Sequence, residues 1–287
     1  MFARTKKTLT VLLVALVTVG VSQASATATG ASRDATSVTN DVQRAASTIN
    51  AGPPYNFLTE LIRYDVVPLK NLAVLAKTKL GYRFRTGQQD SHLVVTRVDG
   101  GLRFADRGTR SFKKLAPSCK RLKVDRGIAA VCRVPGDISV RRPLLIEVWP
   151  RLGDDFTDTS TLPATFAVSV LSDKGHDVAY FGAGPDFFNG FSGRDRVWGG
   201  AGNDWLRGGL QNDTLRGGPG NDDIVAFTGH DKVIGGQGDD RVGGGDGDDR
   251  IWGNTGADFV LCGTGRDRAN VDATDRIFND CESRYFS

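Results

Sequence analysis

The sequence predicts an all-β protein built mainly from short repeated strands, and three observations lead to this prediction. A nine-residue period runs without a gap over residues 172–270. Of the 36 glycines, 25 lie in that region, with no Gly-X-Y triplet period that would indicate collagen. Before it, β-branched and aromatic runs alternate with glycine turns, a pattern typical of strands. Charged residues at 24% and aromatic residues at 8% argue against a disordered chain.

Residues 1–26 are typical of a secretory signal peptide. Basic side chains at positions 4, 6 and 7 precede an apolar run over 9–21, and Ala24-Ser25-Ala26 offers an A-x-A cleavage pattern. The apolar run is shorter than the roughly 20 residues that a membrane helix needs. We therefore expect export with no stable membrane anchor.

The remaining chain divides into four segments. Residues 27–56 are small and polar and indicate a flexible N-terminus. Residues 57–150 indicate a helix followed by a small β domain, 151–270 the repeat region, and 271–287 a C-terminal cap in which Val271, Ile277 and Phe278 close the end of the core.

A short helix is expected after Pro68, because apolar residues follow in helical spacing and proline is tolerated in a first turn. The residues in that spacing are Leu69, Leu72, Leu75, Ala76 and Leu80. Strand patterns follow at 82–84, 92–98, 102–104, 128–134 and 144–149. The run Gly153-Asp154-Asp155 is similar to a degenerate repeat turn and precedes Asp177 by somewhat more than two repeat units, so we expect an enlarged first coil.

The repeat has a fixed composition at each position. The fourth residue is glycine in ten of the eleven units, the eighth is always apolar, and the sixth is always aspartate: Asp177, Asp186, Asp195, Asp204, Asp213, Asp222, Asp231, Asp240, Asp249, Asp258 and Asp267. The turn glycines of the best units are Gly199, Gly200, Gly202, Gly217, Gly218, Gly220, Gly235, Gly236, Gly238, Gly244, Gly245 and Gly247. Glycine allows the positive φ of a tight turn, and positions seven to nine form a short strand whose middle side chain points inward.

This G-G-x-G-x-D-x-U-x pattern resembles the RTX, or haemolysin-type, calcium-binding repeat. The resemblance implies a parallel β-roll, which is a β-solenoid in which two units make one coil and equivalent turns recur in every second unit. It also implies several Ca²⁺ ions between stacked turns, held by the sixth-position aspartates. A looser resemblance is to secreted actinobacterial-type calcium-binding proteins, in which a short cysteine loop and an LGDD strand precede the repeats.

Electrostatics indicates the same ion. Carboxylates stacked at strand spacing, about 4.8 Å, repel one another by about 3 kcal/mol per pair at an effective dielectric near 20. A hard divalent cation removes this repulsion and takes oxygen ligands from aspartate and backbone carbonyls, which suits Ca²⁺ better than Zn²⁺ or Cu²⁺. We therefore expect a fold that depends on calcium.

Alternate turns form two columns of unequal quality. The column from Asp186 to Asp258 has nearly perfect units. Where glycine is expected, the other column has Phe191, Gln211, Ala226, Phe227 and Cys262. Nine spaces between turns are available for ions. We expect fewer to be filled, mainly in the first column.

Four cysteines in an exported chain predict disulfides, and three pairings are possible. The pairs close in sequence are Cys119 with Cys132 and Cys262 with Cys281. The second would tie the cap to the last coil. Free thiols are the alternative, and a metal site is disfavoured because the chain has no C-x-x-C and its three histidines are scattered.

The net charge of +4 hides a division, since residues 172–287 carry −8 and residues 1–171 carry +12. In the weaker column, outward positions seven and nine form a basic-aromatic strip that includes Arg196, Trp198, Arg216, Arg250 and Trp252. Three roles fit this strip: binding of an anionic cell-surface polymer, a cation–π ladder that stabilises the coil, or a face that the N-terminal region covers.

No metalloprotease, hydrolase, P-loop or dinucleotide motif is present, and nothing supports nucleic-acid binding. We therefore predict a secreted, non-enzymatic calcium-binding protein that folds after export. The alternatives are a calcium-dependent module that binds a cell surface or wall polysaccharide and, third, a hydrolase with an N-terminal catalytic domain.

Overall fold

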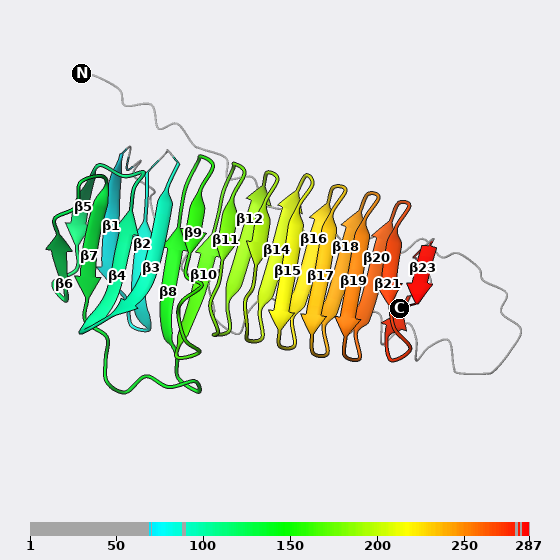
Figure 1. Ribbon diagram of the computed structural model, residues 1–287. Coiled ribbons are helices and arrows are strands. Elements are labelled where there is room, and N and C mark those ends of the chain that lie inside the picture. The colour runs from blue at the N-terminus through cyan, green and yellow to red at the C-terminus, as the bar shows by residue number, and fades with distance from the viewer. Residues whose placement is uncertain (1–68, 70, 88–89, 279–280, 282, 287) are drawn as a thin grey trace, which may run out of the picture. The chain divides into compact units, whose positions relative to one another are not determined.

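The computed structural model describes residues 69, 71–87, 90–278, 281 and 283–286, all within one compact unit of the chain (Figure 1). The described strands form two sheets. In spatial order, sheet A contains β22 (Arg276–Ile277), β20 (Phe259–Thr264), β18 (Arg241–Asp246), β16 (Asp223–Thr228), β14 (Trp205–Leu210), β12 (Phe187–Ser192), β10 (Phe166–Leu171), β8 (Leu144–Trp149), β2 (Gly81–Arg85), β1 (Leu72–Lys77) and β5 (Ser111–Leu115). Sheet B contains β23 (Ser283–Phe286), β21 (Arg268–Val271), β19 (Arg250–Thr255), β17 (Lys232–Gln237), β15 (Thr214–Pro219), β13 (Arg196–Trp198), β11 (Val178–Tyr180), β9 (Phe156–Asp158), β3 (His92–Val98), β4 (Gly101–Asp106), β7 (Ile128–Cys132) and β6 (Cys119–Leu122).

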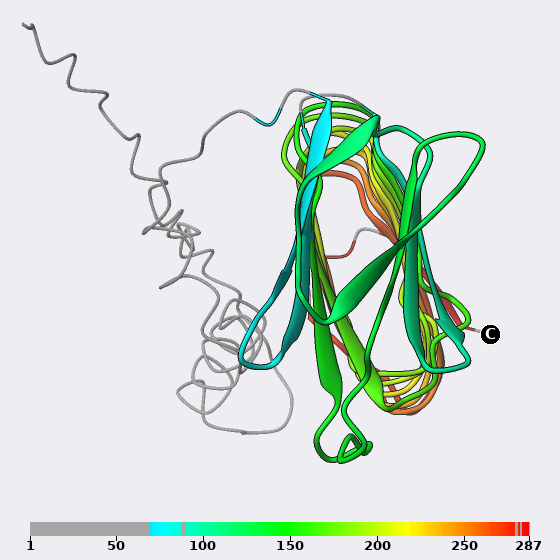
Figure 2. The same ribbon diagram turned by 90° about the vertical axis from the view of Figure 1, so that its left-hand side faces the viewer.

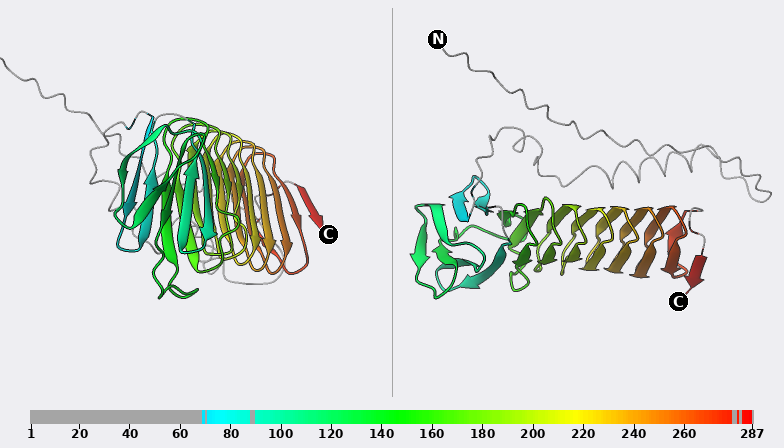
Figure 3. Two further views of the ribbon diagram at one scale, coloured as in Figure 1. Left: turned by 60° about the vertical axis from the view of Figure 1, so that its left-hand side comes forward. Right: turned by 90° about the horizontal axis from the view of Figure 1, so that it is seen from above.

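Residues 172–270 form the predicted parallel β-roll, whose strands alternate between the two sheets (Figure 3). Each strand pairs in parallel with the strand two units later, so that Trp205 lies beside Asp223 and Leu206 beside Ile224. This register confirms that two nonapeptides make one coil. The eighth-position side chains, such as those of Leu206 and Ile224, are fully buried between the sheets.

The strands before the repeats continue the same two sheets, as the end-on view in Figure 2 shows. β8 and β10 pair in parallel with each other, and β2 pairs in parallel with β8. β9 joins β3 to β11 in sheet B. Antiparallel pairing begins beyond these strands, at β1 with β2 and at β3 with β4. The expected strands at 82–84, 92–98, 102–104, 128–134 and 144–149 are confirmed as β2, β3, β4, β7 and β8.

The helix expected after Pro68 is wrong, because Leu72–Lys77 is the strand β1 and the described residues contain no helix. The run Leu72-Ala73-Val74-Leu75-Ala76 is apolar at every position, and such a run fits a strand that is buried on both faces as well as it fits a helix. Ala73 and Leu75 point into the core between the sheets, whereas Val74 is buried outside it.

The core changes in character along the molecule. Before the repeats it contains large rings, with Phe104 stacked on Phe84 at 6.3 Å between ring centroids and edge-on to Tyr82 at 6.0 Å. Within the repeats, the eighth-position residue is the main apolar side chain that each strand contributes.

Both sequence-local disulfide predictions are confirmed, and no cysteine is free. Cys119–Cys132 links β6 to β7, and Cys262–Cys281 ties the C-terminal segment to β20.

The C-terminal cap closes the core with Val271, which is buried, and with Ile277 at its edge. The expectation that Phe278 joins the core is wrong. The Phe278 ring centroid lies 4.6 Å from that of Phe259. Phe259 is the seventh residue of its repeat unit, and its side chain faces away from the core.

Candidate metal centres

The sixth-position aspartates lie in two buried columns, one before the strands of each sheet. Their Oδ1 atoms form a ladder in which the backbone N–H of each aspartate donates a hydrogen bond to Oδ1 of the aspartate one coil later. The N···Oδ1 distance is 2.8 Å both from Asp204 to Asp222 and from Asp195 to Asp213. Column one contains Asp186, Asp204, Asp222, Asp240 and Asp258, and column two contains Asp177, Asp195, Asp213, Asp231, Asp249 and Asp267; each is at most 4% exposed.

The other carboxylate oxygen, Oδ2, is buried without a hydrogen-bond donor in nine of the ten aspartates from Asp177 to Asp258. The exception is Asp186, whose Oδ2 accepts a hydrogen bond from the Gly182 N–H at 3.3 Å. An acceptor that is buried without a donor is costly, and a charged one more so. A repeated row of such oxygens is what a row of bound cations would satisfy.

In the seven units that begin with glycine, this first glycine leaves space beside Oδ2. A Cβ atom placed on Gly199 would lie 2.5 Å from Oδ2 of Asp204 and 2.7 Å from the carbonyl oxygen of Gly217 in the next coil. A Cβ on Gly217 would meet Oδ2 of Asp222 at 2.1 Å. A side chain in place of one of these glycines would therefore fill a space lined by oxygens from two adjacent coils.

The second glycine brings the turns close together. Gly218 has a φ of +130°, and a Cβ there would lie 1.9 Å from the carbonyl oxygen of Gly200. Only a residue without a side chain allows this approach of one backbone to the next. The glycines therefore keep the oxygens of neighbouring turns near one another.

Burial is the main cause that raises the pKa of these carboxyl groups, and charges of neighbouring aspartates add to it at several positions. The pKa is about 6 for Asp177, Asp222, Asp231 and Asp258, about 7 for Asp195 and Asp249, and about 8 for Asp213 and Asp240; it is raised well above the ordinary value for Asp186 and Asp204. A column of ionised aspartates is thus unfavourable without a bound cation, although the backbone hydrogen bonds of the ladder lower the pKa and so oppose the effect of burial.

These residues fit a hard cation such as Ca²⁺, which prefers carboxylate and carbonyl oxygens. No group of three or more His, Cys, Asp or Glu side chains converges among the described residues. An ion in the turns would therefore depend on backbone carbonyl oxygens as much as on aspartate.

The two columns have similar turn geometry in spite of their different sequences. Phe191, Gln211 and Phe227 take φ values of 65°, 78° and 81°, in the left-handed region that glycine occupies elsewhere. The same holds for Asn254 in column one, at 73°. The Oδ1 ladder is continuous through these turns, so a larger share of ions in column one stays a prediction.

Three features were missing from the predicted set of site residues. Asp155 extends column two: its N–H donates to Asp177 Oδ1 at 2.8 Å, and its buried Oδ2 has no donor. Burial raises the pKa of Asp155 to about 9. At the opposite end Asp275 closes column one, since its carboxylate accepts hydrogen bonds from the N–H groups of Asp258 and Asp272. The short Asp154-Asp155 run was the available signal for the first.

The third feature is a second ladder at position five. The Asn203 side chain accepts a hydrogen bond from the N–H of Asn221 at 3.0 Å, and His230 accepts one from Asp248 at 2.8 Å. These bonds run in the direction opposite to the aspartate ladder. The polar residues at position five of most units were the signal for it.

The basic-aromatic strip lies on the outer face of sheet B, as predicted. Arg196 and Arg250 are exposed and Trp198 is half-buried. Tyr180 stacks on Trp198 at 4.4 Å between ring centroids, and the Lys232 ammonium lies 5.3 Å above Trp252. These contacts are those of a ladder along the coil.

Comparison with known proteins gives one match. The family model of the RTX calcium-binding nonapeptide repeat, which spans four copies, matches residues 189–224, 225–260 and 234–269. No curated protein and no solved structure matches the chain significantly. In the part of the chain that the structure describes, no helix is long and apolar enough to cross a membrane.

Proposed function

Since residues 189–269 carry RTX calcium-binding nonapeptide repeats, we propose that the two aspartate columns bind several Ca²⁺ ions and that this binding drives the folding of the roll. The observation that carries the proposal is the row of buried Oδ2 atoms without donors, repeated from coil to coil. Asp155 extends the proposed set beyond the matched repeats.

Each residue type has a distinct task in this mechanism. Oδ2 of aspartate and the carbonyl oxygen of the first glycine would hold the ion, which supplies the positive charge that the columns lack. Oδ1 fixes the orientation of the carboxylate through the ladder. The second glycine allows successive turns to approach, so filling one turn favours the next.

We propose further that the protein is secreted. RTX repeats are typical of secreted proteins, and two disulfides fit an oxidising compartment. The predicted signal peptide lies outside the described residues. Extracellular calcium modules bind with affinities of about 10⁻⁴ to 10⁻³ M, so a chain with such sites would fold after export. The proposal includes no catalytic step.

A calcium titration of the full chain tests the proposal. Calorimetry should give several ions per chain, and the far-UV circular dichroism signal of β structure should rise cooperatively over the same range. A complete β signal in excess chelator, or no heat of binding, would refute it. Mg²⁺ at equal concentration is the control, because it demands a stricter octahedral site.

A second function uses the outer face of sheet B, where exposed Arg196 shares β13 with half-buried Trp198, and exposed Arg250 shares β19 with half-buried Trp252. We propose it as a calcium-dependent surface for an anionic cell-surface polymer. Binding to an anionic wall polysaccharide should weaken when Arg196→Ala and Arg250→Ala are combined. Arg241→Ala on sheet A is the matched control, and equal binding by both variants would contradict this role.

A further inference from the structure

Several apolar side chains are buried outside the core cluster, on the outer face of sheet A. Val74 in β1, Leu145 in β8, Ala167 in β10 and Phe187 in β12 are 6%, 5%, 0% and 6% exposed. None of them belongs to the core between the sheets, which takes the alternate residues of the same strands. Successive side chains of a strand point to opposite faces, so these four point away from the core.

The four belong to one continuous surface. Leu145 is in register with Ala167, and Ser169 is in register with Phe187. Arg83 in β2 lies at the same level: it forms an ion pair with Glu147 at 2.7 Å, and its guanidinium lies 4.2 Å over the ring of Trp149. We call the set Val74, Arg83, Leu145, Ala167, Ser169 and Phe187 the outer patch.

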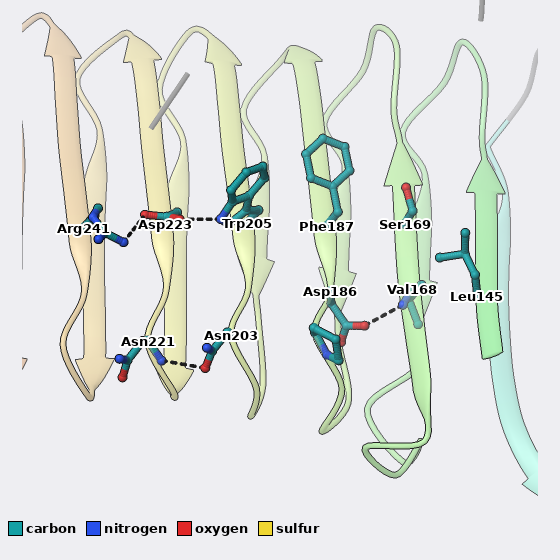
Figure 4. A pocket seen from close by; sticks show the side chains of 11 residues that line it. Leu145, Val168, Ser169, Asp186, Phe187, Asn203, Trp205, Asn221, Asp223 and Arg241 are labelled. Carbon is teal, nitrogen blue, oxygen red and sulfur yellow. Dashed lines mark hydrogen bonds and ion pairs between the residues drawn. The ribbon is translucent and has the colours of Figure 1, made fainter. Parts of the chain in front are cut away.

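A cover is needed to explain the burial of the outer patch. All described strands belong to the two sheets, so no described strand lies over it. The same outward row becomes open further along, where Trp205 and Asp223 are half-buried and Arg241 is exposed (Figure 4). A cavity of about 410 Å³ spans this transition, and its lining includes Leu145, Ser169 and Phe187 of the patch as well as Trp205, Asp223 and Arg241 of the open strands. A single sheet face does not bury itself, and the buried Arg83–Glu147 pair would be solvated without a cover.

We propose that the chain's own residues 52–67 cover the outer patch. The segment ends next to Leu69, whose carbonyl oxygen accepts a hydrogen bond from the N–H of Leu72 at the start of β1. The patch runs from β1 to β12, which is four strand spacings or about 19 Å, and about 13 helical residues span this distance. A segment tethered this closely has an effective concentration near the millimolar range, far above that of a separate molecule.

The sequence of the segment suits this position. Phe57, Leu58, Leu61, Ile62 and Val66 recur at helical spacing, so a helix of this segment would have one apolar face. Polar residues, among them Arg63, would lie on its other face. The proposal goes beyond calcium binding, since it gives the coils before the repeats a layer that needs no ion.

Thiol reactivity tests this proposal on the full chain. All four native cysteines are disulfide-bonded, so the Ser169→Cys variant carries one free thiol. The Ser169 hydroxyl is buried without a hydrogen-bond partner, and the substitution therefore removes no bond. Arg241→Cys is the matched control, on the same outward row but exposed.

The expected result is that a maleimide labels the Ser169→Cys thiol at least about tenfold more slowly than the Arg241→Cys thiol. Deletion of residues 52–67 should bring the first rate to that of the control and leave the control rate unchanged. The double substitution Leu61→Asp with Ile62→Asp should act like the deletion, and Arg63→Ala should not.

Two results would overturn the proposal. One is slow labelling of the Ser169→Cys thiol that survives the deletion, because another occupant then covers the patch. The other is slow labelling that disappears on dilution, because a second copy of the chain then covers it. Equal calcium stoichiometry in all variants separates these outcomes from failure of the calcium proposal.

Discussion

The coils before residue 172 and the repeat coils share the same two sheets, but they differ in how many apolar side chains they bury. β8 and β10 each send three apolar side chains into the core and bury further residues on the outer face. The repeat strands β14 and β16 contribute mainly Leu206 and Ile224. Burial of each such side chain is worth about 1.5–3 kcal/mol, so the early coils gain far more from burial than the repeats do.

The repeats bury fewer apolar side chains, and they also bury aspartate carboxylates whose Oδ2 atoms have no hydrogen-bond donor. Their buried, ionised aspartates make the metal-free coil unfavourable, and in the proposed function a bound ion reverses this. The comparison therefore predicts one solenoid with two kinds of coil, of which the first is stable alone and the second needs bound ions. The early coils end in the edge strands β10 and β9, with which β12 and β11 pair in parallel.

Removal of calcium should have the largest effect and should separate the two regions. In excess chelator at neutral pH, we expect amide hydrogens of residues 199–270 to exchange rapidly, while those of 92–106 and 128–149 stay protected. Hydrogen exchange read by mass spectrometry measures this. Equal protection loss in both regions would show that the early coils are not independently stable.

Lowering the pH should partly replace the ion. The folded-state pKa values of the aspartates, about 6 to 8, lie above the ordinary unfolded value, so protonation favours the fold. Metal-free repeats should therefore be more folded near pH 5 than at pH 8, losing stability as the pH rises through 6 to 8. Circular dichroism in chelator measures this, and a roll that is less folded at pH 5 contradicts the burial argument.

A core truncation in the early coils should be costly under all conditions. Phe104→Ala removes a fully buried ring that packs against Phe84 and Tyr82, at a cost of about 3–5 kcal/mol. Because no aspartate column is involved, the loss in denaturant unfolding should be similar with calcium and with chelator. A loss seen only with calcium would mean that the early coils also depend on the ion.

Opening the C-terminal disulfide should cost less. Cys262→Ser with Cys281→Ser removes a crosslink over 19 residues, worth about 3 kcal/mol in the chain-entropy model. The loss should appear in calcium-loaded unfolding and should be accompanied by fraying of β20 to β22. An unchanged midpoint would contradict a role for the cap in holding the last coil.

The sequence predicted the repeat region closely because each position of a nonapeptide has one structural task. The two-unit coil, the inward eighth position and both disulfides followed from spacing alone or with the resemblance. The segment after Pro68 was misjudged because an apolar run that is buried on two faces has neither the helical nor the alternating period, and local sequence does not show that Val74 is buried outside the core. Asp155 and Asp275 stand outside the nonapeptide register, so only their place in the columns identifies them.

The smallest predicted effect separates the two roles of one aspartate. In Asp222→Asn, the amide oxygen can still accept the hydrogen bond from the Asp204 N–H, but the charge is gone. With calcium the variant should bind fewer ions or bind them about tenfold more weakly, since a hard cation prefers a carboxylate. In chelator it should instead be more stable, by about 1 kcal/mol, because it buries no charge.

Asp223→Asn is the matched control: this outward neighbour accepts a hydrogen bond from Trp205 and belongs to neither column. Calorimetry and denaturant unfolding of both variants measure the opposite signs. A loss of stability in chelator would mean that Asp222 supports the coil through its hydrogen bonds alone.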